Sequence, residues 1–146
     1  MDWIQLTDSQ EEFQVPDGYY YTREHEWVKK TSEGTVKIGI TDYAAKMLHD
    51  VVYVTLPSDG TEFNAKDVFG QVESVKTVSD IYMPVSGKII RTNETLTRTP
   101  ESVSNSPYDE GWMLEVQAKQ VDAEISQLLN PKEYRAFIEE LKKSEA

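Results

Sequence analysis

The chain has 146 residues and a formal net charge of −11, with 26 acidic side chains against 15 lysines and arginines. This charge argues against nucleic acid and anionic membranes as partners, because both repel an acidic protein. The sequence has no cysteine and two histidines, which excludes disulfides, thiolate nucleophiles and sulfur-ligated metals made from its own side chains, and disfavours a histidine-rich metal site.

The length fits one domain with a single core. No run approaches the roughly 20 apolar residues of a membrane-spanning helix. No secretory signal is visible, and the first residues are too acidic for a mitochondrial presequence, so we expect a cytoplasmic protein, or a matrix protein only if a presequence has been removed. Residues 1–17 predict an N-terminal arm, anchored if at all by Trp3, Ile4 and Leu6, and residues 18–146 predict the folded domain.

The first half of the domain predicts short strands broken by turns, with one short helix. β-Forming residues fall between clusters of Gly, Ser, Asp and Pro, which favour turns. Thr41 or Asp42 can cap the helix. The expected elements are, in chain order, strands at 27–28 and 35–40 joined by a turn at 31–34, a helix at 43–48, and strands at 51–56 and 61–63.

The stretch from Phe69 to Gly87 predicts a second hairpin, with Lys76 at its tip. β-Forming residues run up to Val75, and a second apolar run begins at Val78. Lys76 falls where the chain must reverse, so its ammonium group should project into water. A turn lysine is usually a solubilising residue, and the pattern alone favours that interpretation.

In the last part of the domain the spacing of apolar residues changes from that of strands to that of helices. Asn130 is the expected N-cap of a C-terminal helix, and Glu133 can complete a capping box. The expected elements are a strand at 88–92, a mostly looped segment with room for one helical turn at 93–110, a strand at 112–116 opened by Gly111, one or two helical turns near 125–129, and a helix from Pro131. The helix carries an apolar stripe that should pack on the β domain, made of Tyr134, Phe137, Ile138 and Leu141.

Several motifs resemble those of one family, the glycine cleavage system H protein. The match at the hairpin is Val72-Glu73-Ser74-Val75-Lys76, then Ser79-Asp80 and Pro84-Val85-Ser86-Gly87. Further matches lie at Tyr21–Val28, Gly39–Ala44 and Ser106–Trp112, so the resemblance covers roughly residues 18–140. The strands alone predict a mainly β fold, either a small antiparallel barrel or a two-sheet sandwich. The resemblance implies the barrel-sandwich hybrid fold of lipoyl and biotinyl carriers, with short helices and a C-terminal helix.

The resemblance also implies a covalent cofactor, lipoic acid in amide linkage to Lys76. In the family a glutamate at the place of Glu73 helps the lipoate-attaching enzyme to recognise its target, as do glycines at the places of Gly60 and Gly87. A second interpretation of the glycines is structural, since glycine suits tight turns that need positive φ.

Two acidic residues are candidates for docking the loaded arm. The resemblance suggests that Glu26 and Asp80 belong to a shallow surface where a carboxylate could hold a cationic amine by a charge-assisted hydrogen bond. The simpler alternative is that they are inert, as most exposed acidic residues are.

The function implied is that of a non-catalytic carrier. It would move the aminomethyl group of glycine from the pyridoxal-phosphate-dependent glycine decarboxylase (P protein) to the aminomethyltransferase (T protein), and dihydrolipoyl dehydrogenase (L protein) would reoxidise the arm. The alternative keeps the lipoyl group in another circuit, as a lipoyl donor to other complexes or in sulfur oxidation with heterodisulfide-reductase-like partners. We expect a monomer without nucleic-acid or membrane partners.

Leu48-His49-Asp50 departs from the family's common Leu-Gly-Asp. Some members also have histidine where Met47 lies. Histidine tolerates positive φ less well than glycine, so the change predicts an altered helix C-cap. His49 is then either a surface histidine or a proton relay, and the first interpretation is the simpler.

Other classes of protein fit less well. Biotin carriers place the modified lysine between methionines, whereas Val75 and Thr77 flank Lys76. An unmodified β-rich adaptor would not need a lysine at the tip. An independent enzyme lacks support, because the sequence shows no nucleophile–base pair, phosphate loop or metal cluster.

Overall fold

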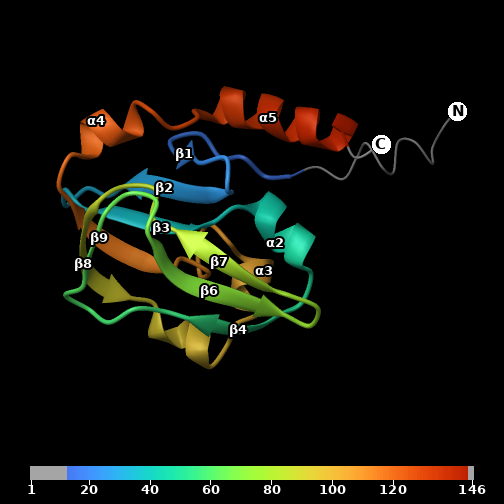
Figure 1. The fold of residues 1–146 in the computed structure, drawn as a ribbon, viewed down its shortest axis with the longest axis horizontal. Coiled ribbons are helices and arrows are strands. Elements are labelled where there is room, and N and C mark those ends of the chain that lie inside the picture. The colour runs from blue at the N-terminus through green and yellow to red at the C-terminus, as the bar shows by residue number, and fades with distance from the viewer. Residues whose placement is uncertain (1–12, 145–146) are drawn as a thin grey trace, which may run out of the picture.

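The computed structural model describes residues 13–144, which form two antiparallel sheets with helices at their margins (Figure 1). The six-stranded sheet has the order β1 (Tyr20–Tyr21), β2 (Glu26–Lys30), β3 (Val36–Ile40), β9 (Leu114–Ala118), β8 (Gly87–Thr92), β5 (Glu62–Phe63). The three-stranded sheet has the order β4 (Val51–Thr55), β6 (Val68–Ser74), β7 (Val78–Tyr82). The helices are α2 (Asp42–Leu48), the 3-10 helix η1 (Glu94–Thr97), α3 (Ser102–Asn105), α4 (Val121–Ile125) and α5 (Pro131–Ser144). The prediction of a mainly β protein with short helices and a C-terminal helix is confirmed.

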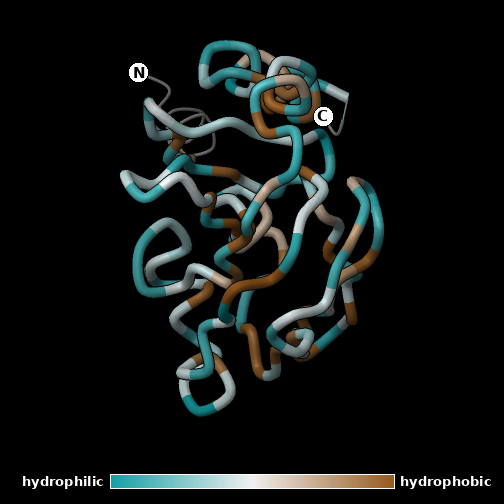
Figure 2. Tube along the Cα trace, turned by 90° about the vertical axis from the view of Figure 1, so that its left-hand side faces the viewer, coloured by the Kyte–Doolittle hydropathy of each residue, from teal (hydrophilic) through white to brown (hydrophobic). Residues whose placement is uncertain are grey.

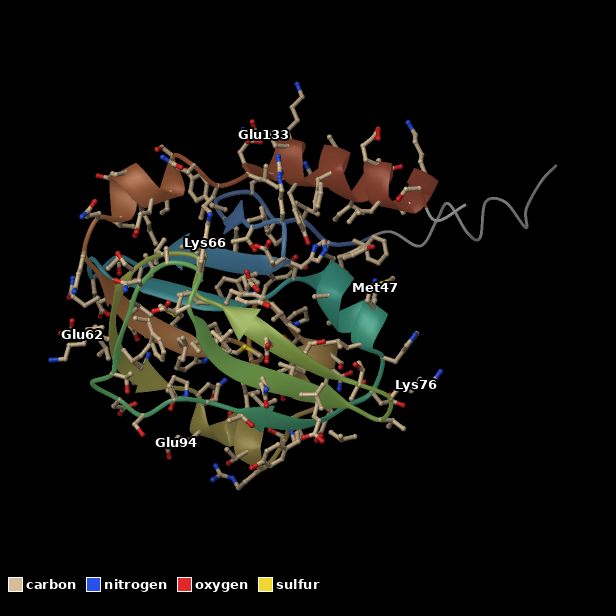
Figure 3. All side chains as sticks on the ribbon, viewed as in Figure 1. Met47, Glu62, Lys66, Lys76, Glu94 and Glu133 are labelled. Atoms are coloured by element: carbon tan, nitrogen blue, oxygen red, sulfur yellow. The ribbon has the colours of Figure 1, made fainter. Side chains whose placement is uncertain are left out.

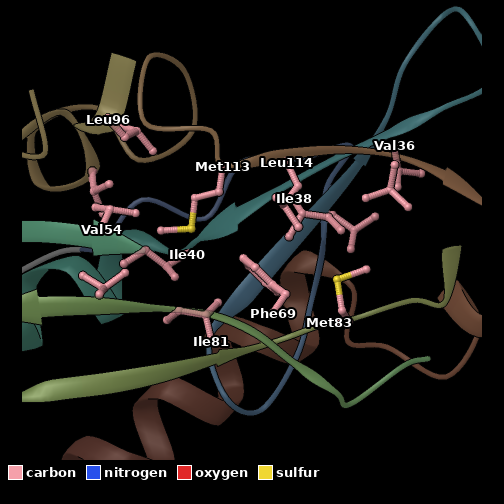
Figure 4. Packing of buried hydrophobic residues seen from close by; sticks show 14 of the residues in the cluster. Val36, Ile38, Ile40, Val54, Phe69, Ile81, Met83, Leu96, Met113 and Leu114 are labelled. Carbon is pink, nitrogen blue, oxygen red and sulfur yellow. The ribbon is translucent and has the colours of Figure 1, made fainter. Parts of the chain in front are cut away.

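The hydrophobic core lies between the two sheets. β3 contributes Ile38 and Ile40, and the smaller sheet contributes Phe69 and Ile81 from the opposite side (Figure 4). Hydrophobic segments lie toward the middle of the molecule, whereas the outer loops are hydrophilic (Figure 2). A shared core of this kind fixes the orientation of one sheet relative to the other. It therefore also fixes the position of the β6–β7 hairpin, which belongs to the smaller sheet.

Helix α5 lies over the β1–β2 edge of the larger sheet (Figure 1). Its predicted capping box is confirmed: the backbone N–H of Glu133 donates to Asn130 Oδ1 (2.8 Å), and that of Asn130 donates to Glu133 Oε1 (2.9 Å). The predicted stripe also packs inward, because Tyr134 and Ile138 are buried. Local sequence signals therefore place this helix correctly.

The hydroxyl of Tyr134 joins α5 to the β domain. It lies 2.7 Å from His25 Nδ1 and 2.7 Å from Thr41 Oγ1. Desolvation lowers the pKa of His25 to about 4, so the imidazole is neutral in this contact at neutral pH. The aromatic ring of Tyr134 stacks on Tyr21, with 4.6 Å between the ring centroids.

Helix α2 begins as predicted. Thr41 rather than Asp42 is its N-cap, since Thr41 Oγ1 accepts a hydrogen bond from the backbone N–H of Ala44 (3.2 Å). This observation decides between the two candidates.

Two segments differ from the predicted boundaries. Strand β9 begins at Leu114 rather than at residue 112. The backbone N–H of Trp112 donates to the Asp109 carbonyl in a turn (3.1 Å), and Asn93 Nδ2 donates to the carbonyls of Glu110 and Trp112 (2.8 Å each). The helical turns predicted near 125–129 lie earlier in the chain, as α4 (Val121–Ile125), which shares only Ile125 with the predicted range. The chain beyond it is needed to pair Leu129 with Tyr21.

The predicted N-terminal arm is described only from residue 13. Trp3, Ile4 and Leu6, its proposed anchors, lie outside the described residues. Within residues 13–17, Val15 is buried and its carbonyl accepts a hydrogen bond from Arg135 Nη2 (2.8 Å). This part of the arm therefore packs on α5.

Candidate functional site

Lys76 lies in the turn that joins β6 to β7, at one end of the molecule (Figure 3). Glu73 pairs with Val78 in the last register position before the turn. The buried side chain of Ser74 holds the turn: its Oγ accepts hydrogen bonds from the backbone N–H groups of Lys76 (3.4 Å) and Thr77 (3.2 Å). The predicted hairpin with Lys76 at its tip is confirmed.

The side chain of Lys76 is exposed, and among residues 13–144 its amine has no hydrogen-bond or ion-pair partner. An acyl group joined to this amine would therefore displace no internal contact. Because the backbone of the turn is fixed by Ser74, the attachment point is rigid while the side chain is free. These features fit a covalently carried group.

Glu73 is exposed on β6, the middle strand of the smaller sheet, with Tyr53 opposite it on β4 and Val78 opposite it on β7. Its carboxylate makes no ion pair within the described part of the chain. The structure thus brings Glu73 and Lys76 together on one hairpin. Side chains directly opposite each other in antiparallel strands share a face of the sheet.

Glu26 is buried, with 1% of its surface exposed, rather than lying on a shallow surface. Its Oε1 accepts a hydrogen bond from Thr22 Oγ1 (2.6 Å), and its Oε2 accepts one from the backbone N–H of Tyr82 (3.2 Å). Desolvation raises the pKa of Glu26 to about 7, although both hydrogen bonds oppose the rise. Pairing with an incoming cation would favour the ionised form.

Glu26 also lines a pocket of about 820 Å3 between the β1–β2 connection, the end of β7 and α4. Arg23, Lys66 and Glu124 contribute charged groups to its wall, and Met83 contributes apolar surface. The pocket therefore offers both an apolar wall and a buried carboxyl group.

Asp80 occupies a different environment from Glu26. It is exposed on β7 and accepts a hydrogen bond from Gln71 Nε2 (2.9 Å). It is not among the residues that line the pocket, although Tyr82, two residues further along β7, is. The two predicted docking residues thus lie in different sheets, Glu26 on β2 and Asp80 on β7, and do not form one cluster.

Gly60 and Gly87 are both associated with β8: Gly87 is its first residue, and Gly60 bonds to its backbone. Gly60 has a φ of +88° and donates its N–H to the carbonyl of Ile89 (2.8 Å), as a turn glycine does. At Gly87 a Cβ atom would come within 2.5 Å of the Gln117 carbonyl oxygen. The fold therefore requires glycine at both positions, and neither glycine lies at the hairpin tip that carries Lys76.

His49 is exposed and follows the last residue of α2, with φ 64° and ψ −124°. Its backbone N–H donates to the Ala45 carbonyl (3.1 Å), and its own carbonyl accepts from Ser104 Oγ (3.1 Å). The histidine thus has a positive φ, which is unusual for a residue with a β-carbon. The altered C-cap suggested by the departure from Leu-Gly-Asp stays a prediction.

Two supporting residues escaped the sequence argument. Ser74 stands at the first position of a four-residue turn, where serine is favoured, so a local signal was available. Thr22 holds the Glu26 carboxyl group across the turn between β1 and β2, four residues before it in the chain. The contact is local, but nothing in the sequence marks Glu26 as buried.

Within residues 13–144, no cluster of three or more His, Cys, Asp or Glu side chains is arranged to hold a metal ion. No helix in this range is both long and apolar enough to cross a membrane.

Comparison with known proteins gives consistent results. The family model "Glycine cleavage H-protein" matches residues 19–141. The glycine cleavage system H protein of Mycolicibacterium smegmatis is 46% identical over 129 residues, which is 87% of this chain and 98% of that protein. A probable glycine cleavage system H protein of Thermococcus gammatolerans is 45% identical over 130 residues, 89% of this chain and 96% of that protein.

A crystal structure of a glycine cleavage system H protein from Mycobacterium marinum superposes with a TM-score of 0.76 and 36% identity, covering 84% of this chain and 97% of that one. The expected barrel-sandwich fold is thereby confirmed. From these matches and from the shared fold, the chain belongs to the glycine cleavage H-protein family.

Proposed function

We propose that this protein is the lipoyl carrier of a glycine cleavage system, with lipoic acid in amide linkage to Lys76. The observation that carries the proposal is the exposed amine of Lys76, which has no partner in the part of the chain that the structure describes, on a turn that Ser74 fixes. Family membership supports the same assignment. The protein would be a carrier without an active site of its own.

Lys76 suits this role by its chemistry. Its primary amine can form a stable amide, which removes one positive charge, whereas the guanidinium of arginine cannot be acylated in this way under biological conditions. When bound, the lipoyl group supplies a dithiolane that accepts electrons and a one-carbon fragment. The rigid hairpin limits where an arm attached to Lys76 can move, which raises its effective concentration at a docked partner.

The partners follow from the proposed role. The carrier would receive the aminomethyl group at glycine decarboxylase, pass it on at aminomethyltransferase, and be reoxidised by dihydrolipoyl dehydrogenase. A lipoate-attaching enzyme would first modify Lys76, with Glu73 as a recognition residue and Gly60 and Gly87 as positions that shape the fold it recognises. We place these steps in the cytoplasm, or in the mitochondrial matrix if a presequence is removed.

The pocket beside Glu26 is the proposed resting place for the amine at the end of the loaded arm. A cationic amine would pair with the ionised carboxylate, and Asp80 would assist from the outer part of β7. Glu26→Gln and Asp80→Asn should each shorten the lifetime of the loaded arm in a hydrolysis assay. Unchanged lifetimes would remove both residues from the proposal.

Replacement of Lys76 by arginine tests the assignment directly. Wild-type protein from its natural source should carry the mass of one lipoyl group on Lys76 and support exchange of labelled bicarbonate with glycine by purified decarboxylase. Lys76→Arg should show neither property and should unfold at the same temperature as the wild type. Lys88→Arg, at an exposed lysine on β8, is the matched control and should behave as wild type.

Two results would contradict the proposal. Bare Lys76 in native protein would exclude lipoylation as the basis of its role. Full lipoylation without any exchange would instead support the other lipoyl circuits named above.

A further inference from the structure

The outer face of the β4–β6–β7 sheet exposes four large apolar side chains near Lys76. Their exposed fractions are 50% for Val52, 55% for Tyr53, 74% for Val75 and 51% for Val78. We call these four residues the apolar platform. Exposed apolar side chains that gather in one patch often mark an interaction site, whereas scattered ones need no explanation.

A β-bulge creates half of this platform. Val51 pairs with Ser74 and Tyr53 pairs with Glu73, so the register shifts between these pairs. In a regular strand, neighbouring side chains point to opposite faces. Here Val51 and Val54 are buried and the two residues between them are both exposed. Bulges commonly re-aim side chains in this way near functional sites.

The register then places Glu73 between platform residues. Tyr53, Glu73 and Val78 are direct neighbours across three strands, so their side chains share one face. Val75 stands next to Lys76 in the turn. The result is a carboxylate that has no ion-pair partner among residues 13–144 and is flanked by Tyr53 and Val78, near the lysine. Gln71 and Asp80 form the next pair along the same face.

We propose that the apolar platform, with Glu73 at its centre, is the docking surface of the enzyme that acylates Lys76. This inference rests on the proposed function. Before modification Lys76 has only its four-carbon stem, so the acylating enzyme must bring its own active site onto the tip. Enzymes that act on the far end of the attached arm need not touch these residues.

The partner surface should therefore be apolar, with an arginine or lysine facing Glu73. Docking would place the deprotonated Lys76 amine against the carbonyl carbon of an activated lipoyl group, held as a mixed anhydride or thioester. An N–C bond forms as the bond to the activating group breaks. The activating group leaves with that electron pair, and the proton lost by the amine passes to a base of the enzyme or to water.

The test uses the unmodified chain with a purified lipoate ligase, lipoate and ATP, and follows product by intact mass. The variant Tyr53→Ser/Val78→Thr removes platform surface from exposed strand positions. Its kcat/KM for lipoylation should fall roughly tenfold or more, mainly through KM. Val68→Thr is the matched control, because Val68 is an exposed valine at the far end of the same sheet, and its rate should stay near wild type.

Further variants separate docking from folding. Val78→Ile keeps the apolar surface and should be lipoylated like the wild type, while Glu73→Lys should raise KM by repelling the partner's cation. All variants should keep the wild-type far-ultraviolet circular dichroism and melting temperature.

The outcomes distinguish this inference from the function on which it rests. A wild-type chain that the ligase cannot lipoylate at Lys76 would overturn both. Normal lipoylation of Tyr53→Ser/Val78→Thr beside a lipoylated wild type would overturn the docking surface alone. If that variant, once fully lipoylated, lost only its glycine–bicarbonate exchange, the platform would belong to the decarboxylase and the inference would be wrong.

Discussion

At Glu26 a carboxyl group is buried between the hydroxyl of Thr22 and the backbone of Tyr82, and desolvation raises its pKa to about 7. The pKa in the unfolded chain is lower, near 4.5, so the native state favours the protonated acid. The stability that this preference contributes is complete below pH 4.5 and is lost as the pH rises through about 7.

Glu26→Gln should remove this pH dependence. The glutamine leaves one of the two donors without its acceptor, so the variant is less stable than wild type at low pH. The stability difference between wild type and variant should shrink, or reverse, by on the order of 3 kcal/mol between pH 4.5 and 8. Urea unfolding at both pH values measures the difference, and parallel pH profiles would contradict the assignment.

His49 stores strain that a glycine would release. A β-carbon at φ 64° and ψ −124° is unfavourable, and such strain costs about 1–3 kcal/mol, offset in part by the extra freedom of glycine in the unfolded chain. His49→Gly should therefore raise the free energy of unfolding by about 1 kcal/mol. His49→Ala keeps the β-carbon and should show no such gain, so an equal gain in both variants would refute the strain argument.

These two residues also mark what sequence can predict about the site. The place of Lys76 was foreseen because the hairpin pattern is local. The positive φ of His49 was not foreseen, because a histidine in place of glycine suggested a changed C-cap instead. The burial of Glu26 was not foreseen, since it depends on the packing of residues far apart in the chain, Tyr82 among them.

At the scale of elements, α5 depends on its N-terminal cap. The reciprocal bonds of Asn130 and Glu133 satisfy two backbone donors that the helix cannot satisfy itself. Asn130→Ala should lower the free energy of unfolding by about 1 kcal/mol, measured by chemical denaturation. Gln120→Ala is the control, because Gln120 caps α4 without a side-chain hydrogen bond, and a similar loss there would argue against the cap as the cause.

The elements were predictable where the signals are local. Capping residues located α2 and α5, and turn residues located the hairpins. β1 and the start of β9 were missed or shifted because tertiary contacts decide them: Leu129 pairs with Tyr21, and the Asn93 side chain holds the backbone before β9. The bulge in β4 was also missed, because a register shift depends on the partner strand.

At the scale of the whole molecule, two sheets with a shared core form a stiff body that carries one flexible lysine side chain at its end (Figure 3). The net charge of −11 surrounds this body with a negative potential. Such a field favours encounter with partners that present basic patches around their active sites. Lipoylation would make the net charge more negative, because forming the amide removes the positive charge of Lys76.

Salt should therefore weaken lipoylation of the unmodified chain. Raising the ionic strength from about 0.05 M to about 0.5 M shortens the screening length severalfold and should raise the KM of the ligase, with kcat little changed. At about 0.1 M the screening length is roughly 10 Å, so only charges near the docked partner contribute strongly. Glu73→Gln/Asp80→Asn, on the outer face of the hairpin, should flatten the salt dependence of KM. Glu139→Gln/Glu140→Gln removes the same charge from the exposed side of α5 and should leave the salt dependence intact, whereas equal flattening in both variants would mean that net charge alone steers the encounter.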